Sequence, residues 1–197
     1  MAFTGRPELL LPAGDLEKLK YAFKYGADAV YAGLPAASLR ARPNGFSRED
    51  LIEGIKHAHD LGEKVYATVN IFPHNSKLQA IEDHIKWLRD EAKPDALIIA
   101  DTGIIHMMKE IWPEGEIHLS VQANNVNWRQ LKFWYDLGVT RVILSRELRL
   151  KEIEEMHKKV PEMELEAFVH GAICIAYSGR CLISNYMSAR DPNYGTC

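Results

Sequence analysis

The chain has 197 residues, of which 47% are hydrophobic and 26% are charged, proportions that are ordinary for one globular domain. Its hydrophobic runs are too short to cross a bilayer, its first residues lack the apolar core of a signal peptide, and it has three cysteines, an odd number. These features exclude a membrane protein and a disulfide-rich secreted scaffold, and they predict a cytoplasmic location. The net charge of −3 lacks the basic surplus of a dedicated nucleic-acid binder, so an RNA substrate would require a local basic patch or a part of the protein outside this chain.

Apolar runs typical of buried strands alternate with amphipathic helical segments along the chain. We expect strands at residues 9–13, 29–34, 64–72, 95–100, 118–123, 141–145 and 164–170. We expect helices at residues 16–26, 48–61, 77–91, 102–112, 128–137 and 150–159. Asp15 is placed to cap the first helix, and Ser47 with Asp50 forms a capping box ahead of the second. The alternation predicts a parallel sheet that is covered by helices on its outer side.

Seven strands are one fewer than the eight of a (β/α)8 barrel, whose usual size is about 250 residues. The fold class that we predict is α/β, a (β/α)8 TIM-barrel-like fold truncated to seven β/α units, in a single domain without an internal linker. The missing eighth unit would leave an open edge between the first and seventh strands. Open edges invite pairing with another chain, so this edge is a candidate homodimer interface.

Polar side chains stand at the ends of several otherwise apolar strands. The candidates for binding a substrate are Asn70, Gln122, Asn124, Arg146 and Glu147. In a barrel of this kind the functional residues gather at the carboxyl ends of the strands, so we expect these side chains to surround one mouth. Each alone also has a plain structural interpretation as a cap, a turn residue or a buried hydrogen-bonding group.

Glu166 and His170 are the candidate catalytic residues. They lie four apart on the last expected strand, so they should face the same side. If that side is the barrel interior, Glu166 is placed to pair with Arg146, and His170 is placed to act as an acid–base group. The alternative is a structural Glu–Arg pair inside the barrel.

All three cysteines, Cys174, Cys181 and Cys197, lie in one stretch rich in Gly, Ser, Asn and Pro, a composition typical of a loop. Three thiols in one loop indicate a metal or cluster site, although a cysteine can also be a small buried hydrophobe. The wide spacing lacks the tight pair of a zinc site and favours an iron–sulfur cluster, but a [4Fe–4S] cluster normally takes four thiolates. Pairing of Cys174 or Cys181 with His170 as a nucleophile and base would explain one cysteine only.

The same stretch carries a family resemblance. The pattern E-x-F-x-x-G-A-x-C-x-x-x-S-G-x-C-x-x-S, which spans residues 166–184, resembles the collagenase-like peptidase family of unassigned catalytic type, peptidase family U-32. Residues 7–15, 26–33, 68–72 and 145–148 resemble other segments of that family. The matches run from one end of the chain to the other.

The resemblance implies a barrel and a longer protein, of which residues 1–197 would be the N-terminal fragment with a cysteine loop at residues 171–197. It implies a [4Fe–4S] cluster on the three cysteines, with the fourth ligand further along. Residues 179–181 and 185–187 look closest to the branch that hydroxylates the wobble uridine of tRNA. The resemblance thus implies an RNA-modifying hydroxylase with tRNA as its partner and prephenate as a co-substrate. A collagenase-like peptidase and a non-catalytic barrel with a structural metal are the alternatives.

Overall fold

A computed structural model describes residues 5–39, 45–171, 174, 176–178 and 180–188 of the chain. Its seven strands form one sheet in the order of the sequence, and every neighbouring pair is parallel. The strands are β1 (Leu10–Pro12), β2 (Ala29–Ala32), β3 (Lys64–Val69), β4 (Ala96–Ile99), β5 (Ile117–Leu119), β6 (Arg141–Ile143) and β7 (Glu164–Glu166). The predicted seven-unit TIM-barrel-like fold is confirmed.

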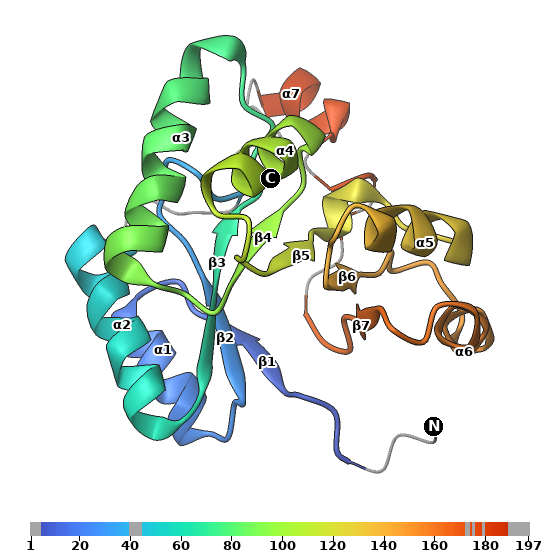
Figure 1. Cartoon of the computed structure of the whole chain (residues 1–197), viewed down its shortest axis with the longest axis horizontal. Helices are drawn as coiled ribbons and strands as arrows, with labels where there is room; N and C mark the ends of the chain where they lie inside the picture. Colours follow the sequence, from blue (N-terminus) through green and yellow to red (C-terminus); the bar gives the residue numbers. More distant parts are fainter. Residues whose placement is uncertain (1–4, 40–44, 172–173, 175, 179, 189–197) are drawn as a thin grey trace.

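Six helices alternate with the strands and lie along the outer side of the curved sheet (Figure 1). They are α1 (Leu16–Lys24), α2 (Arg48–Leu61), α3 (Leu78–Trp87), α4 (Thr102–Ile111), α5 (Trp128–Asp136) and α6 (Leu150–Lys159). Asp15 accepts a hydrogen bond from the backbone N–H of Lys18, and Ser47 and Asp50 form the capping box ahead of α2, as the sequence predicts. Within the described residues, no helix is long and apolar enough to cross a membrane.

The central strands of the sheet, β3, β4 and β5, are buried on both faces. Its outer face packs against the helices in one large apolar cluster, which includes Val30, Leu97 and Val142. Its inner face forms a smaller cluster of Ala29, Tyr66, Ala96, Ile98 and Ile143. Parallel strands that are covered on both sides are usually apolar along most of their length. A polar side chain on the inner face is therefore a candidate for a functional or pairing role.

All seven strands end earlier than the sequence predicts, and β5 and β7 end four residues earlier. β5 stops at Leu119 because Ser120 turns the chain into a short 3-10 helix (Val121–Ala123), and Asn124 follows with a left-handed φ of 56°. β7 stops at Glu166 rather than continuing to residue 170. The prediction of strand at residues 120–123 and 167–170 is therefore wrong, since apolar composition alone does not locate the turn that ends a strand.

A seventh helix, α7 (Leu182–Ser188), lies in the stretch for which we expect a loop. The loop prediction rests on the Gly and Pro residues of that stretch, yet Leu182–Ser188 contains neither. A short segment free of helix breakers can form two turns between flanking loops. The predicted cysteine loop is thus interrupted by a helix.

Candidate active site at the mouth of the barrel

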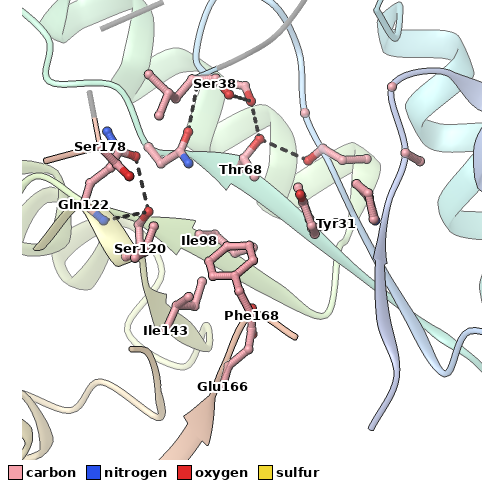
Figure 2. Close-up of a pocket in the computed structure, with 18 of the residues that line it drawn as sticks. Tyr31, Ser38, Thr68, Ile98, Ser120, Gln122, Ile143, Glu166, Phe168 and Ser178 are labelled. Atoms are coloured by element: carbon pink, nitrogen blue, oxygen red, sulfur yellow. Dashed lines mark hydrogen bonds between the residues drawn. The ribbon is translucent and has the colours of Figure 1, made fainter. Parts of the chain in front are cut away.

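A cavity of about 660 Å³ opens at the carboxyl ends of the strands; we call it the barrel cavity. Tyr31, Ile98, Ile143 and Glu166 line it from the inner face of the sheet, and polar groups from the connecting loops line its upper part (Figure 2). Its size falls within the usual range of small-molecule sites, about 300–1,000 Å³.

A second cavity of about 480 Å³, the loop cavity, is lined by Asn124, Ser145 and Glu147, which follow β5 and β6, and by Cys174, Ala176 and Tyr177 of the cysteine-bearing stretch. Val121, Arg146 and Ser178 line both cavities. The Arg146 guanidinium donates a hydrogen bond to Ser178 Oγ, which lies 3.4 Å from Cys174 Sγ. Arg146 and Ser178 thus line both cavities, and their contacts link the barrel cavity to the thiol of Cys174.

The structure brings most of the predicted substrate-binding and catalytic residues together. Asn70, Gln122 and Glu166 line the barrel cavity, Asn124 and Glu147 line the loop cavity, and Arg146 lines both. The list of strand-end polar residues therefore converges on one mouth, as a barrel fold requires.

Two of these residues also hold the loops in place. Asn70 Oδ1 accepts a hydrogen bond of 2.8 Å from the backbone N–H of Leu39, which ties the loop after β2 to the end of β3. Asn124 Oδ1 accepts a hydrogen bond of 3.0 Å from Ser145 Oγ, which joins the loops after β5 and β6.

His170 and the cysteines fit less well with the expectation. His170 is exposed and lines neither cavity, because β7 ends four residues before it. Cys174 lines the loop cavity, Cys181 is partly buried and lines neither cavity, and Cys197 lies outside the described residues. In the part of the chain that the structure describes, no three His, Cys, Asp or Glu side chains are grouped to hold a metal ion.

The expected pair between Glu166 and Arg146 is wrong, because Glu166 faces Arg141 instead. Arg141 Nη1 lies 3.7 Å from Glu166 Oε2 and 2.6 Å from Glu8 Oε1, and Nη2 lies 2.7 Å from Glu164 Oε2. Arg141 pairs with Glu164 in the β6–β7 register, and Glu166 follows two residues later on the same face. Arg146 lies three residues beyond the end of β6, where it reaches the mouth and not the interior.

We call Glu8, Tyr66, Arg141, Glu164 and Glu166 the barrel-floor cluster. The Tyr66 hydroxyl donates to the Glu8 carboxylate at 2.9 Å and 3.0 Å, and the Arg141 guanidinium lies 5.1 Å from the centre of the Tyr66 ring. Sequence reasoning missed Arg141 because it stands at the amino end of its strand. It missed Glu8 because that residue precedes the first strand.

Burial gives the floor unusual protonation states. Burial raises the pKa of Glu166 to about 7, although the nearby Arg141 opposes the shift. The ring centre of His118 lies 4.4 Å from that of Tyr66. Burial lowers the pKa of His118 to about 3, so this imidazole is neutral at physiological pH. A carboxyl group that titrates near neutrality and faces a cavity is suited to acid–base chemistry.

Gly33 is required by the tight packing at one wall of the barrel cavity. A Cβ atom at this position would lie 2.0 Å from Thr68 Oγ1, which is held by Ser38 Oγ at 2.6 Å and by the Ala32 carbonyl at 3.3 Å. We expect Gly33→Ala to cost about 1–3 kcal/mol of unfolding free energy, because Thr68 must leave its hydrogen bonds. Urea denaturation measures this loss. Gly14→Ala is the matched control in the same cavity, because the nearest atom to its Cβ lies 3.9 Å away; equal stability of the two variants would contradict the prediction.

Comparison with known proteins identifies the family. The sequence model described as peptidase family U32 matches residues 14–197. The chain is 59% identical over 192 residues to "tRNA hydroxylation protein P" of Escherichia coli K12, covering 98% of this chain and 42% of the relative. It is 48% identical over 194 residues to "tRNA hydroxylation protein P1" of Bacillus subtilis 168, covering 98% of this chain and 46% of the relative.

More distant proteins share the family or the fold. The chain is 32% identical over 201 residues to a "Collagenase" of Porphyromonas gingivalis W83, covering 96% of this chain and 48% of the relative. A solved structure of the U32 peptidase Mk0906 superposes with a TM-score of 0.72 at 14% identity, covering 98% of this chain and 77% of that one, which supports the fold. The chain spans less than half the length of these curated relatives. The match to the family model over residues 14–197 shows that the chain belongs to peptidase family U32.

Proposed function

We propose that this chain is the barrel part of an enzyme that hydroxylates tRNA, acting on the wobble uridine in the cytoplasm. The observation that carries the proposal is 59% identity, over nearly the whole chain, to a protein named for tRNA hydroxylation. A relative at 38% identity is named as a 23S rRNA 5-hydroxycytidine synthase, so hydroxylation of RNA is common to both names. The strand-end residues at the two cavities would surround the base, and Glu166 would act as the acid–base group.

Mass spectrometry of tRNA nucleosides tests this function. A strain that lacks the gene should lose a uridine species one oxygen atom heavier than uridine, and the full-length protein supplied in trans should restore it. An unchanged nucleoside profile in the deletion strain would overturn the proposal.

An iron–sulfur cluster on Cys174, Cys181 and Cys197 is a further part of the proposal. Thiolates are the ligands that such clusters take. Cys174 lines the loop cavity together with Arg146 and Ser178. The donor chemistry fits, while the third cysteine lies outside the described residues. A bound cluster would supply one-electron transfer next to the substrate site, and the fourth ligand would come from the rest of the protein.

The cluster is tested on the full-length protein purified without oxygen. We expect about four iron atoms per chain, on the stoichiometry of a four-iron cluster, and absorption in the visible region. Cys174→Ser and Cys181→Ser should each lose most of the iron. Full retention of iron by both variants would contradict the assignment.

Prephenate is the co-substrate that we propose for the barrel cavity. The cationic side chain of Arg146 lines this cavity and suits a carboxylate. Titration calorimetry with the full-length protein should detect binding of prephenate, and Arg146→Met should weaken it. Equal affinity in the variant would remove Arg146 from this role.

A peptidase is the second candidate function, because the family name and the 32% identical collagenase point to it. The geometry favours it less. Cys174 Sγ lies 3.4 Å from Ser178 Oγ, whereas His170 is exposed and outside both cavities. Hydrolysis of gelatin by the full-length protein that survived Cys174→Ser and Cys181→Ser would favour the peptidase over the cluster enzyme.

We also propose that the chain forms a homodimer through the open edge of the barrel. In the described residues, β1 and β7 are the two ends of the sheet, and each pairs on one side only. Unpaired edges are a ready template for another strand. Light scattering of this chain should give the mass of a dimer, and a monomer at all concentrations would contradict it.

A further inference from the structure

Ser178 is a buried serine that stands between an arginine and a cysteine. Its exposed fraction is 5%, and it lines both the barrel cavity (Figure 2) and the loop cavity. Its Oγ accepts a hydrogen bond from the Arg146 guanidinium and lies 3.4 Å from Cys174 Sγ, a hydrogen-bond distance for an acceptor as large as sulfur. The hydroxyl therefore contacts two groups of opposite character at once.

The direction of the Ser178 O–H bond follows from the chemistry of these neighbours. A guanidinium carries N–H donors and no acceptor, so the proton of the serine cannot be shared with Arg146 and goes to another atom. Buried hydroxyl groups nearly always find an acceptor, and Cys174 Sγ lies within reach. Ser178 thus donates to the sulfur, and Arg146 holds the hydroxyl in that orientation.

A donor at this sulfur matters because Cys174 is one of the three proposed cluster ligands. When a cluster takes up one electron from an external reductant, its sulfur ligands become more negative. A hydrogen bond to a more negative acceptor is stronger. A donor at a ligand sulfur therefore stabilises the reduced form and raises the reduction potential.

We infer that Ser178 is a positioning residue that raises the reduction potential of the cluster through its hydrogen bond to Cys174 Sγ, with Arg146 fixing the serine. This inference rests on the proposed cluster. Arg146 also lines the barrel cavity, so the side chain that orients Ser178 belongs to the candidate co-substrate site as well.

The test is a potentiometric titration with dithionite of the full-length protein purified without oxygen, followed by visible absorption. Ser178→Ala should keep the iron and shift the equilibrium about tenfold toward the oxidised form, the size of one hydrogen bond. For a one-electron couple this is a potential about 59 mV lower. Ser178→Thr keeps a hydroxyl and should stay near the wild-type potential.

Ser145→Ala is the matched control. Ser145 is 4% exposed and lines the same loop cavity, but its hydroxyl donates to Asn124 Oδ1 at 3.0 Å and not to a cysteine. This variant should keep the wild-type potential. Equal potentials in Ser178→Ala and Ser145→Ala would overturn the inference.

Arg146→Met tests whether the arginine acts through the serine. It should lower the potential on its own and change it much less in the Ser178→Ala background, because interacting residues are not additive. Equal shifts in both backgrounds would overturn the orienting role. If Ser178→Ala holds no iron, Arg146→Met alone decides, and a wild-type potential in that variant would overturn the inference.

Iron content and tRNA analysis separate this inference from the proposals beneath it. A wild-type protein without iron would overturn the cluster and this inference together, while the hydroxylated uridine in tRNA is measured independently of both. If wild type holds about four iron atoms and Ser178→Ala keeps its potential, the cluster stands and only the role of Ser178 fails.

Discussion

Replacing Arg141 with methionine is expected to cost about 3–5 kcal/mol of unfolding free energy, the usual loss when one partner of a buried ion pair is removed. The Arg141 side chain is only 12% exposed, and it contacts the carboxylates of Glu8, Glu164 and Glu166. Without the guanidinium, the partly buried carboxylates of Glu8 and Glu166 lose the cation that pairs with them. Urea denaturation at neutral pH measures the loss.

Arg6→Met is the control, because Arg6 makes an ion pair with Asp28 but is 70% exposed. Exposed pairs contribute about 0–1 kcal/mol, so this variant should be nearly as stable as wild type. If Arg141→Met loses no more stability than Arg6→Met, the barrel-floor cluster does not hold the interior of the barrel together.

Glu166→Gln is expected to stabilise the protein at alkaline pH and to leave its stability nearly unchanged in acid. Burial raises the pKa of Glu166 from 4.5 to about 7. Between these values the native state holds a proton that the unfolded state has released, so stability falls as the pH rises. Above pH 7 the wild type bears the whole cost of a buried charge, on the order of 3 kcal/mol, and glutamine avoids it.

The measurement is urea denaturation of wild type and Glu166→Gln from about pH 4.5 to about pH 8, a range that spans the titration. The difference in unfolding free energy should grow with pH in favour of the variant. Glu164→Gln is the control, because its side chain is 63% exposed and should show no such growth. A difference that is independent of pH would mean that Glu166 titrates at its ordinary pKa.

The fold could be predicted because β2, β3 and β4 are mostly apolar and because α1, α2, α4 and α5 begin at side-chain caps. Val30, Leu97 and Val142 are buried against helices as that pattern requires. What periodicity could not give is where a strand stops. Ser120 ends β5 through a hydroxyl cap, and β7 ends at Glu166, so the expectation that His170 shares a strand face with Glu166 failed.

The gathering of the strand-end residues at the candidate site could be predicted, but the partner of Glu166 could not. Polar residues at strand ends converge because the carboxyl ends of parallel strands meet, which requires no knowledge of register. The partner of Glu166 depends on register, and only the pairing of Ile143 with Glu166 shows that Arg141 and not Arg146 lies on its face. Ser178 lies in the cysteine-bearing stretch and not at a strand end, so strand-end reasoning could not predict its contacts with Arg146 and Cys174.

The most direct test of the two cavities as the active site is the amount of hydroxylated uridine in tRNA when a gene-deletion strain carries the full-length protein with a change at Arg146. Arg146 lines both cavities, so Arg146→Met should lower the hydroxylated uridine at least about tenfold, the loss that one charge-assisted contact supplies. Arg129→Met, a change on α5 where the guanidinium lies 4.3 Å from the centre of the Trp128 ring, should restore it fully. Full restoration by Arg146→Met, at the same protein level as wild type, would contradict the account.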